Sequence, residues 1–339
     1  MRFGLFGGAV AKRGDETADS QGYRKFIDLV VEAEGLGFHS IFLVEHHFSG
    51  SGQVSSSLNL LSYLAARTSA IRLGTAVTVL PWHNPVLIAE QAATVDLLSG
   101  GRLDFGVGKG YRDIEFEGFR IPKEEGLPRY EESVELIRKS WLSDERFDHD
   151  GRFWSFRNIV VEPPVVQKPH PPLWSAAGTD ESIARVAKSG FNILLDHFAT
   201  DARTRERLKV WRDACAEIGR PLLADELAVA RGLTITRTEE EYEEAIRARI
   251  ERNAKMAEDY GALPGLRRDA QPETFAVQDM SNPDSALIGT PDRIIERLQR
   301  LRSWGVEYVL ILLPGSVETL REFSREIMPA FETQADAAQ

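Results

Sequence analysis

The feature that most constrains the fold of this chain is a regular alternation of short apolar segments with longer amphipathic ones. Eight segments are typical of buried strands, because they are apolar almost throughout and rich in β-branched and aromatic residues. They are residues 2–6, 40–44, 71–80, 103–108, 173–177, 192–196, 227–236 and 306–313.

Helical periodicity follows the strands. In residues 21–36, Phe26, Val30, Ala33 and Leu36 share one face. Further helices are expected at 58–70, 86–98, 129–141, 180–188, 201–218, 239–260, 291–304 and 317–331. Apolar strands separated by helices indicate a parallel sheet covered on both faces. We therefore predict an α/β fold and a single domain over residues 1–339, a (β/α)8 TIM barrel, with a doubly wound sheet as the alternative.

Two stretches lack a clean period and are expected to be insertions. Residues 143–172 precede the fifth strand, and residues 261–287 precede the last helix–strand pair. Loops of this length inside a compact domain are usually lids or disordered segments.

Charge and cysteine content exclude several classes of protein. Lys and Arg number 41 against 52 Asp and Glu, a net charge of −11. An acidic surface disfavours nucleic acid and anionic membranes as partners. Cys215 is the one cysteine, so no disulfide framework is possible. Residues 1–10 do not resemble a signal peptide, and no apolar run is long enough to span a membrane. We expect a cytoplasmic protein.

The sharpest chemical feature follows the second strand, and catalytic residues of barrels lie at the C-terminal ends of strands. Glu45, His46 and His47 come directly after residues 40–44. Side chains alternate on an extended chain, so Glu45 and His47 should share one side and His46 the other. The functional interpretation is a general base or hydrogen-bond donor. The alternative is a loop whose imidazoles satisfy backbone groups. The spacing does not match a known metal motif, so no metal site is predicted.

Two strand ends have the composition of a phosphate site. Residues 106–111 (GVGKGY) combine glycines with Lys109, and residues 178–182 place hydroxyls at the start of a predicted helix. The alternatives are a tight turn at the first and helix capping by Thr179 at the second. His83 and His197 are interpreted as structural.

Five segments, in order along nearly the whole chain, resemble the bacterial luciferase-like flavin monooxygenases. They are MRFGLF (1–6), GFHSIFLVEHHF (37–48), GTAVTVLPWHNPVLIAEQAATVDLLSGGRLDFGVGKGY (74–111), AAGTDESIARVAKSG (176–190) and IGTPDRIIERLQRLRSWGVEYVLIL (288–312). The resemblance implies FMN at the C-terminal mouth of the barrel, with its phosphate near the fourth and fifth strands.

The resemblance assigns roles residue by residue. His46 matches the active-site histidine, Lys109 and Arg129 match basic phosphate contacts, and Ala76-Val77 matches a non-prolyl cis peptide under the flavin ring. The predicted cofactor contacts are Phe6, Glu45, Ala76, Lys109, Gly110, Tyr111, Arg129, Ala177, Gly178, Thr179 and Ser182.

The function implied is that of a two-component monooxygenase. Reduced FMN comes from a separate NAD(P)H:flavin reductase, oxygen adds to it, and a flavin hydroperoxide oxidises a small organic substrate. His46 would exchange a proton with the peroxide oxygens. Residues 261–287 match the family's mobile active-site loop. Gly108 stands where light-emitting members have cysteine, so light emission is not expected.

Two other functions stay open at this point. One is a deazaflavin-dependent reductase or dehydrogenase on the same barrel, which transfers hydride without oxygen. The other is a flavin-binding protein without turnover. The family also implies a homodimer through early helices that include Leu87, Ile88, Ala92 and Ala93, although these positions could equally face the core.

Overall fold

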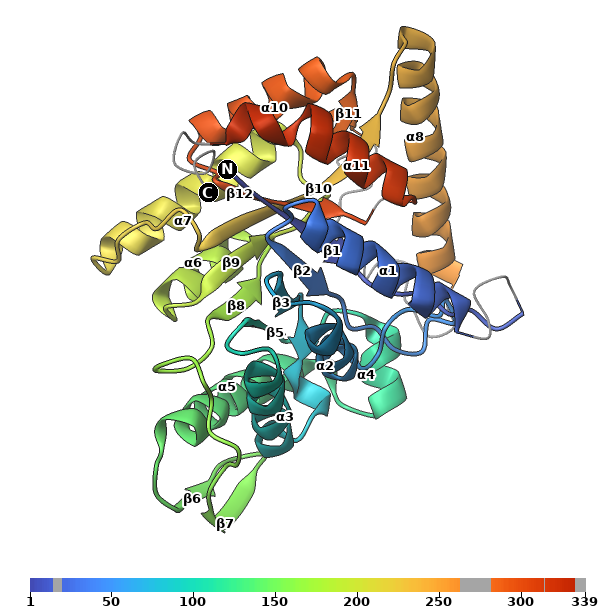
Figure 1. Cartoon of the computed structure of the whole chain (residues 1–339). Helices are drawn as coiled ribbons and strands as arrows, with labels where there is room; N and C mark the ends of the chain where they lie inside the picture. Colours follow the sequence, from blue (N-terminus) through green and yellow to red (C-terminus); the bar gives the residue numbers. More distant parts are fainter. Residues whose placement is uncertain (15–19, 263–281, 314, 333–339) are drawn as a thin grey trace. The chain divides into compact units, whose positions relative to one another are not determined.

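A computed structural model describes residues 1–14, 20–262, 282–313 and 315–332 (Figure 1). The main sheet has the strand order β11-β10-β12-β1-β2-β3-β5-β8-β9, in which β11 is Ala286–Gly289, and a further pairing of β9 with β10 closes the ring. Its eight members are β1 (Arg2–Gly7), β2 (Ser40–Leu43), β3 (Arg72–Thr75), β5 (Leu103–Gly108), β8 (Leu173–Ala176), β9 (Asn192–Leu195), β10 (Leu227–Ile235) and β12 (Tyr308–Leu312). The predicted (β/α)8 barrel is confirmed.

Helices follow the strands as the periodicity predicts. They are α1 (Gln21–Gly35), α2 (Ser57–Arg67), α3 (Pro85–Leu98), α4 (Asp113–Phe119), α5 (Gly126–Leu142), α6 (Asp180–Lys188), α7 (Asp201–Glu217), α8 (Glu239–Ala262), α10 (Pro291–Ser303) and α11 (Val317–Glu326). Short 3₁₀ turns lie at η1 (Leu80–Trp82), η2 (Lys123–Glu125), η3 (Pro283–Ser285) and η4 (Met328–Phe331). Helix α4 was not predicted. Among the described residues, no helix has both the length and the hydrophobicity to cross a bilayer.

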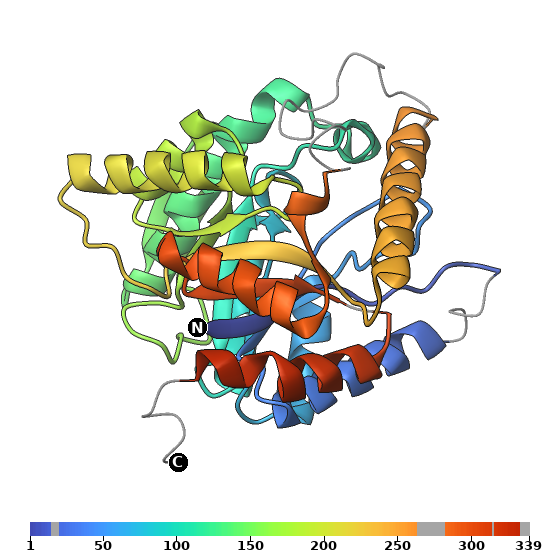
Figure 2. The same cartoon turned by 90° about the horizontal axis from the view of Figure 1, so that it is seen from above.

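The chain divides into two compact units. One comprises residues 1–7, 28–40 and 176–339, and the other comprises 8–27 and 41–175. In the first, Phe3 of β1 packs edge-on against Phe323 of α11 and Phe331 of η4, with ring centroids 5.1 and 5.6 Å apart. Figure 2 shows α11, in red, beside β1, in dark blue. Strands β1 and β12 pair in parallel, with Gly4 opposite Leu310.

The second unit carries a close approach between neighbouring strands. A Cβ at Gly106 of β5 would lie 1.8 Å from the carbonyl oxygen of Thr75, and one at Gly108 would lie 2.4 Å from a methyl group of Val77. The Thr75 hydroxyl also donates to the Gly106 carbonyl at 2.6 Å. Strand packing is therefore sufficient to explain both glycines.

The structure departs from the sequence prediction at three places in this unit. The expected strand 71–80 is two strands, β3 and β4 (Thr78–Val79), and the peptide bond Ala76–Val77 between them is cis, as the resemblance implied. The insertion 143–172 contains an antiparallel hairpin of β6 (Phe147–Asp150) and β7 (Ser155–Ile159). Of the proposed dimer positions, Ile88, Ala92 and Ala93 are buried in the core, whereas Leu87 is exposed.

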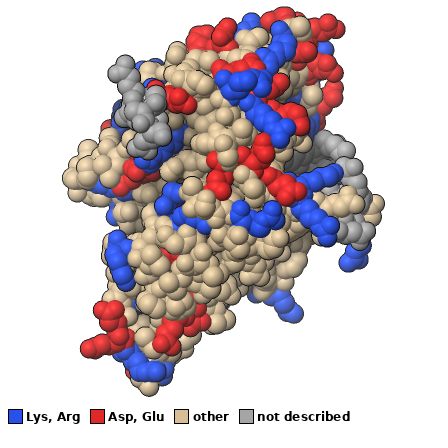
Figure 3. Space-filling model, in the orientation of Figure 1, with Lys and Arg blue, Asp and Glu red and all other residues tan. Residues whose placement is uncertain are grey.

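The second predicted insertion, 261–287, is described only in part, because residues 263–281 lie outside the described residues. Its end forms η3 and a short strand, β11 (Ala286–Gly289), which pairs in parallel with β10. On the face shown in Figure 3, acidic and basic side chains are intermingled.

Candidate active site

The residues that follow β2 contact two buried carboxylates. Nδ1 of His46 lies 3.1 Å from Oε1 of Glu115, and the same oxygen accepts the backbone N–H of His47 at 3.0 Å. Glu115 lies on α4 and is only 1% exposed. A carboxylate 69 residues away in the sequence therefore fixes the orientation of the predicted catalytic histidine.

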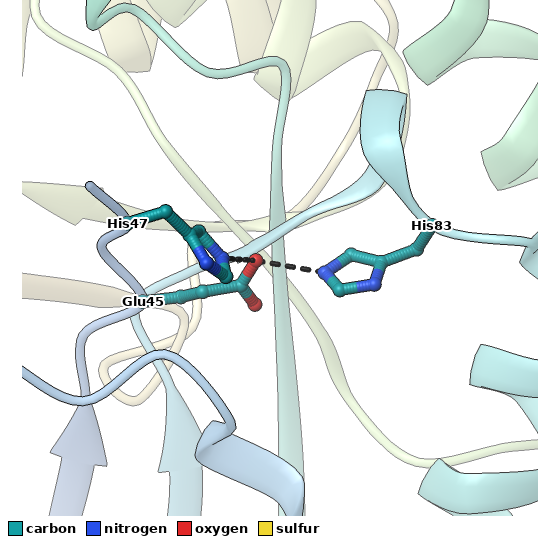
Figure 4. A group of neighbouring side chains, drawn as sticks. All are labelled: Glu45, His47 and His83. Carbon is teal, nitrogen blue, oxygen red and sulfur yellow. Dashed lines mark hydrogen bonds and ion pairs between the residues drawn. The ribbon is translucent and has the colours of Figure 1, made fainter. Parts of the chain in front are cut away.

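Glu45 is the centre of a second cluster (Figure 4). Its Oε1 lies 3.2 Å from Nε2 of His47 and 2.7 Å from Nε2 of His83, and it accepts the indole N–H of Trp82 at 3.1 Å. Glu45 and His47 thus lie on one side of the chain, as the alternation predicted, while His46 contacts a different element. His83 and Trp82 belong to this cluster.

The same three groups are spaced closely enough to hold a metal ion. One ligand atom each from Glu45, His47 and His83 lies within 4.8 Å of the other two. Two imidazoles and one carboxylate are a donor set that divalent metals accept. The contacts are also those of a hydrogen-bonded cluster, in which each imidazole N–H donates to the carboxylate.

Burial and neighbouring groups together lower the pKa values of both Glu45 and His46. Burial is the largest influence on Glu45 and raises its pKa, but the donors from His47 and His83 outweigh it and hold the pKa below the usual 4.5. Burial lowers the pKa of His46, Glu115 raises it, and Arg112 lowers it, so it lies below the usual 6.5. At neutral pH, Glu45 is therefore ionised and His46 neutral.

Aromatic rings surround this pair of clusters. The ring of Tyr111 stands edge-on to His46 with centroids 6.3 Å apart. The ring of Phe119 stands edge-on to His47 at 4.9 Å and stacks on Trp82 at 5.1 Å. These rings give the tandem histidines an apolar, partly exposed setting.

The end of β5 carries an available cation. Lys109 is exposed, and among the residues whose side chains the structure describes (1–14, 20–254, 282–313 and 315–332) no hydrogen bond or ion pair of its ammonium group is found. Gly110, next to it, has φ +75°, a conformation that favours glycine. Ala76 donates its N–H to the carbonyl of Leu43 at 2.7 Å.

Arg129 is engaged rather than free. Its guanidinium pairs with Glu125 one turn earlier at 2.7 Å and lies 4.5 Å above the ring of Phe153. It would have to exchange Glu125 for a phosphate in order to fill the predicted role.

In the other unit, residues 178–182 form a capping box at the start of α6. The Thr179 hydroxyl accepts the N–H of Ser182, and the Ser182 hydroxyl accepts the N–H groups of Gly178 at 3.3 Å and Thr179 at 3.1 Å. The capping alternative is therefore realised in this structure. Asp180 and Glu181 in the first turn are paired with Arg203 at 2.9 Å and Arg185 at 2.6 Å, so they do not leave bare negative charge there.

The remaining predicted contacts of this unit lie at strand ends. Phe6 packs against His197 with ring centroids 5.9 Å apart. Ala177 is buried and donates its N–H to the carbonyl of Leu194 at 3.2 Å. Burial, with the nearby Arg249 and Arg231, lowers the pKa of His197 to about 4, so this imidazole is neutral at pH 7.

Sequence reasoning missed Glu115 and the role of His83. Glu115 lies in a seven-residue helix, DIEFEGF, in which Glu117 looks equivalent from the sequence but is exposed. No local pattern separates the two. For His83, its position after the third strand was a usable signal, because neighbouring strand ends converge in a barrel.

Comparisons with known proteins agree with the fold. The family description "Luciferase-like monooxygenase" matches residues 1–308. The oxygenase component of the flavin-dependent trigonelline monooxygenase of Acinetobacter baylyi is 27% identical, over 99% of this chain and 97% of that protein. The FMNH2-dependent dimethylsulfone monooxygenase of Pseudomonas putida is 28% identical, over 83% of this chain and 79% of that protein.

Two further matches complete the comparison. An uncharacterised protein of Sinorhizobium fredii, y4vJ, is 33% identical over 55% of this chain, and the match spans about half of that protein, 53%. Among solved structures, the monooxygenase RslO1 from Streptomyces bottropensis superposes with a TM-score of 0.84 at 26% identity, over 98% of this chain and 100% of that one. The chain belongs to the luciferase-like monooxygenase family.

Proposed function

We propose that this chain is the oxygenase of a two-component system, which uses reduced FMN from a separate NAD(P)H:flavin reductase and oxygen to oxidise a small organic substrate through a flavin hydroperoxide. The observation that carries the proposal is the His46–Glu115 pair, a mostly buried neutral imidazole held by a buried carboxylate after a barrel strand. A protein that only stored flavin would not need such a group.

The residues present fit a phosphate-bearing flavin. Lys109 offers a cation without a carboxylate partner among the described residues. The first turn of α6 offers backbone N–H groups and the positive end of a helix dipole. The proposed cofactor contacts remain those implied by the resemblance, with Phe6, Ala76, Gly110, Tyr111, Ala177, Gly178 and Ser182 as apolar or backbone contacts and Glu45 acting through His47.

When bound, reduced FMN supplies the electrons that activate oxygen. The chain contributes the proton chemistry. His46 is neutral at pH 7, and its Nε2 is the ring nitrogen not engaged by Glu115, so it can take a proton and return it to water. The aromatic setting of Tyr111, Trp82 and Phe119 limits the access of water to the tandem histidines.

The name of the Acinetobacter relative, an oxygenase component, supports a separate reductase as the partner. We propose a homodimer of cytoplasmic location, with exposed Leu87 as a contact.

The test is to supply reduced FMN with a flavin reductase and NADH and to measure oxygen uptake against hydrogen peroxide released. Trigonelline and dimethylsulfone, named for two relatives, are the first substrates to try. We expect a substrate to lower the peroxide yield while oxygen uptake continues, with one oxygen atom from ¹⁸O₂ in the product. Product formation with reduced deazaflavin under anaerobic conditions would overturn the proposal.

A further inference from the structure

The tandem histidines contact their carboxylates through different ring nitrogens. His46 presents Nδ1 to Glu115 at 3.1 Å, whereas His47 presents Nε2 to Glu45 at 3.2 Å. His83 also presents Nε2 to Glu45, at 2.7 Å. Both carboxylates are buried, at 1% and 3% exposure, so bulk water does not compete for these contacts.

Each carboxylate oxygen has a second neighbour that defines it as an acceptor. Oε1 of Glu115 receives the backbone N–H of His47, and Oε1 of Glu45 receives the indole N–H of Trp82. A backbone amide and an indole can only donate. The imidazole nitrogens that face these two oxygens must donate as well. An unprotonated nitrogen there would place its lone pair against a lone pair of the carboxylate oxygen, and the two would repel each other.

We propose that the two neighbouring histidines are fixed in opposite tautomers, with the proton of His46 on Nδ1 and the proton of His47 on Nε2. Glu115 is then the positioning residue that leaves the Nε2 lone pair of His46 open. Glu45 occupies Nε2 of both His47 and His83 and so removes these nitrogens as proton acceptors. The tautomers follow from geometry alone, while their catalytic meaning rests on the proposed function.

The arrangement selects the direction of proton transfer. Neutral His46 with an open Nε2 accepts a proton from a reacting group, forms an imidazolium whose Nδ1–H faces Glu115, and later returns the proton to water. Arg112 opposes the imidazolium and Glu115 stabilises it. His47 keeps its open lone pair on Nδ1, so the two neighbouring histidines would accept a proton at different ring positions.

The direct test is ¹⁵N NMR of the imidazoles in the full chain, which has seven histidines. Signals are assigned by comparison with His46→Gln and His47→Gln. Protonated and unprotonated ring nitrogens differ widely in ¹⁵N shift. We expect a protonated Nδ1 and unprotonated Nε2 for His46, and the reverse for His47. The reverse pattern at His46, or one averaged signal pair, would overturn the proposal.

Two substitutions of Glu115 separate its charge from its acceptor role. Glu115→Gln keeps an acceptor, so the His46 tautomer should persist while the acid limb of the pH–rate profile moves to lower pH. Glu115→Leu removes the acceptor, so His46 should shift toward protonated Nε2, and turnover at pH 7 should fall on the order of a hundredfold.

Glu117→Gln on the same helix is the matched control, because Glu117 is exposed. It should change neither the tautomer nor the rate. If Glu115→Leu does not fold, the pH–rate profile of Glu115→Gln still tests the role of Glu115. An acid limb at the same pH as in the wild type would contradict the inference. The NMR result does not depend on oxygenase activity, so failure of the proposed function would leave it standing.

Discussion

In the sequence, the ends of β2 and β8 both carry polar side chains that could belong to a functional site. In the structure, the hydrogen-bond partners of these side chains differ in how far away along the chain they lie. After β8, Thr179 and Ser182 bond to each other and to backbone groups within four residues. After β2, Glu45, His46 and His47 reach Trp82, His83 and Glu115, which lie 37 to 69 residues away.

The difference separates a helix cap, which is made by neighbouring residues, from a site that is assembled from residues far apart in the sequence. A helix cap satisfies its own backbone and requires nothing from the rest of the chain. Buried carboxylates that orient two histidines need elements from several strand–helix units, and burying such groups is costly unless every contact is made. We therefore expect substitutions at the β2 end to affect turnover and substitutions at the β8 end to affect stability and cofactor affinity.

The largest expected effect is that of His46→Ala. Loss of the proton acceptor should lower substrate oxidation by about two to four orders of magnitude. Affinity for FMN should stay unchanged, because the phosphate contacts are elsewhere. Rates are measured by oxygen uptake with reductase-supplied FMN, and affinity by fluorescence quenching. Full coupled turnover in this variant would remove His46 from the reaction.

Glu45→Gln should show next that the β2 end is also a stability element. Removing the charge that accepts three donors should lower the free energy of unfolding at pH 7 by about 2 kcal/mol, measured by urea denaturation. Because folding lowers the pKa of Glu45 below 4.5, its contribution is complete above that pH and is lost as the pH falls through the folded value.

The difference in free energy of unfolding between Glu45→Gln and the wild type should therefore become smaller at acidic pH. Glu117→Gln, an exposed carboxyl, is the control and should show no gap at any pH. A gap of constant size from pH 7 to below 4.5 would contradict the role given to the ionised carboxylate.

Thr179→Ala should distinguish a cap from a cap that also binds phosphate. The matched control is Thr290→Ala, because the Thr290 hydroxyl also accepts a backbone N–H, that of Arg293, at the start of α10. Both should lose about 1 kcal/mol of stability. We expect Thr179→Ala alone to weaken FMN binding as well, by about tenfold, since a contact to a charged group adds roughly 1.5 kcal/mol. Equal FMN affinity in both variants would show that Thr179 only caps α6 and does not contact the FMN phosphate.

The smallest expected effect is that of a chelator. If Glu45, His47 and His83 act as a hydrogen-bonded cluster, incubation with EDTA followed by gel filtration should leave turnover and melting temperature unchanged. Loss of turnover or a lower melting temperature after EDTA, with recovery on addition of Zn²⁺, would show that Glu45, His47 and His83 hold a metal ion.

Much of the fold could be predicted from local patterns. The apolar strands and the amphipathic helices come from periodicity, and α6 has the predicted bounds because a Thr179 cap and Ser189-Gly190 mark its ends. The cis bond at Ala76–Val77 was implied by resemblance, whereas periodicity predicted one continuous strand over residues 71–80.

The contacts of the site could be predicted only in part. Alternation placed Glu45 and His47 on one side, which the bond between them confirms. Glu115 could not be found, since its burial depends on how α4 packs and not on any pattern in its helix. Helix α4 itself is too short for a periodic signal.

The most direct measurement is rapid mixing of the anaerobic complex of this protein and reduced FMN with oxygenated buffer, followed by absorbance in the near ultraviolet. We predict a species distinct from reduced and oxidised FMN that persists in the wild type and decays faster in His46→Ala at equal FMN affinity. Direct return of the wild-type complex to oxidised FMN, at the rate of free FMN, would contradict oxygen activation at this site.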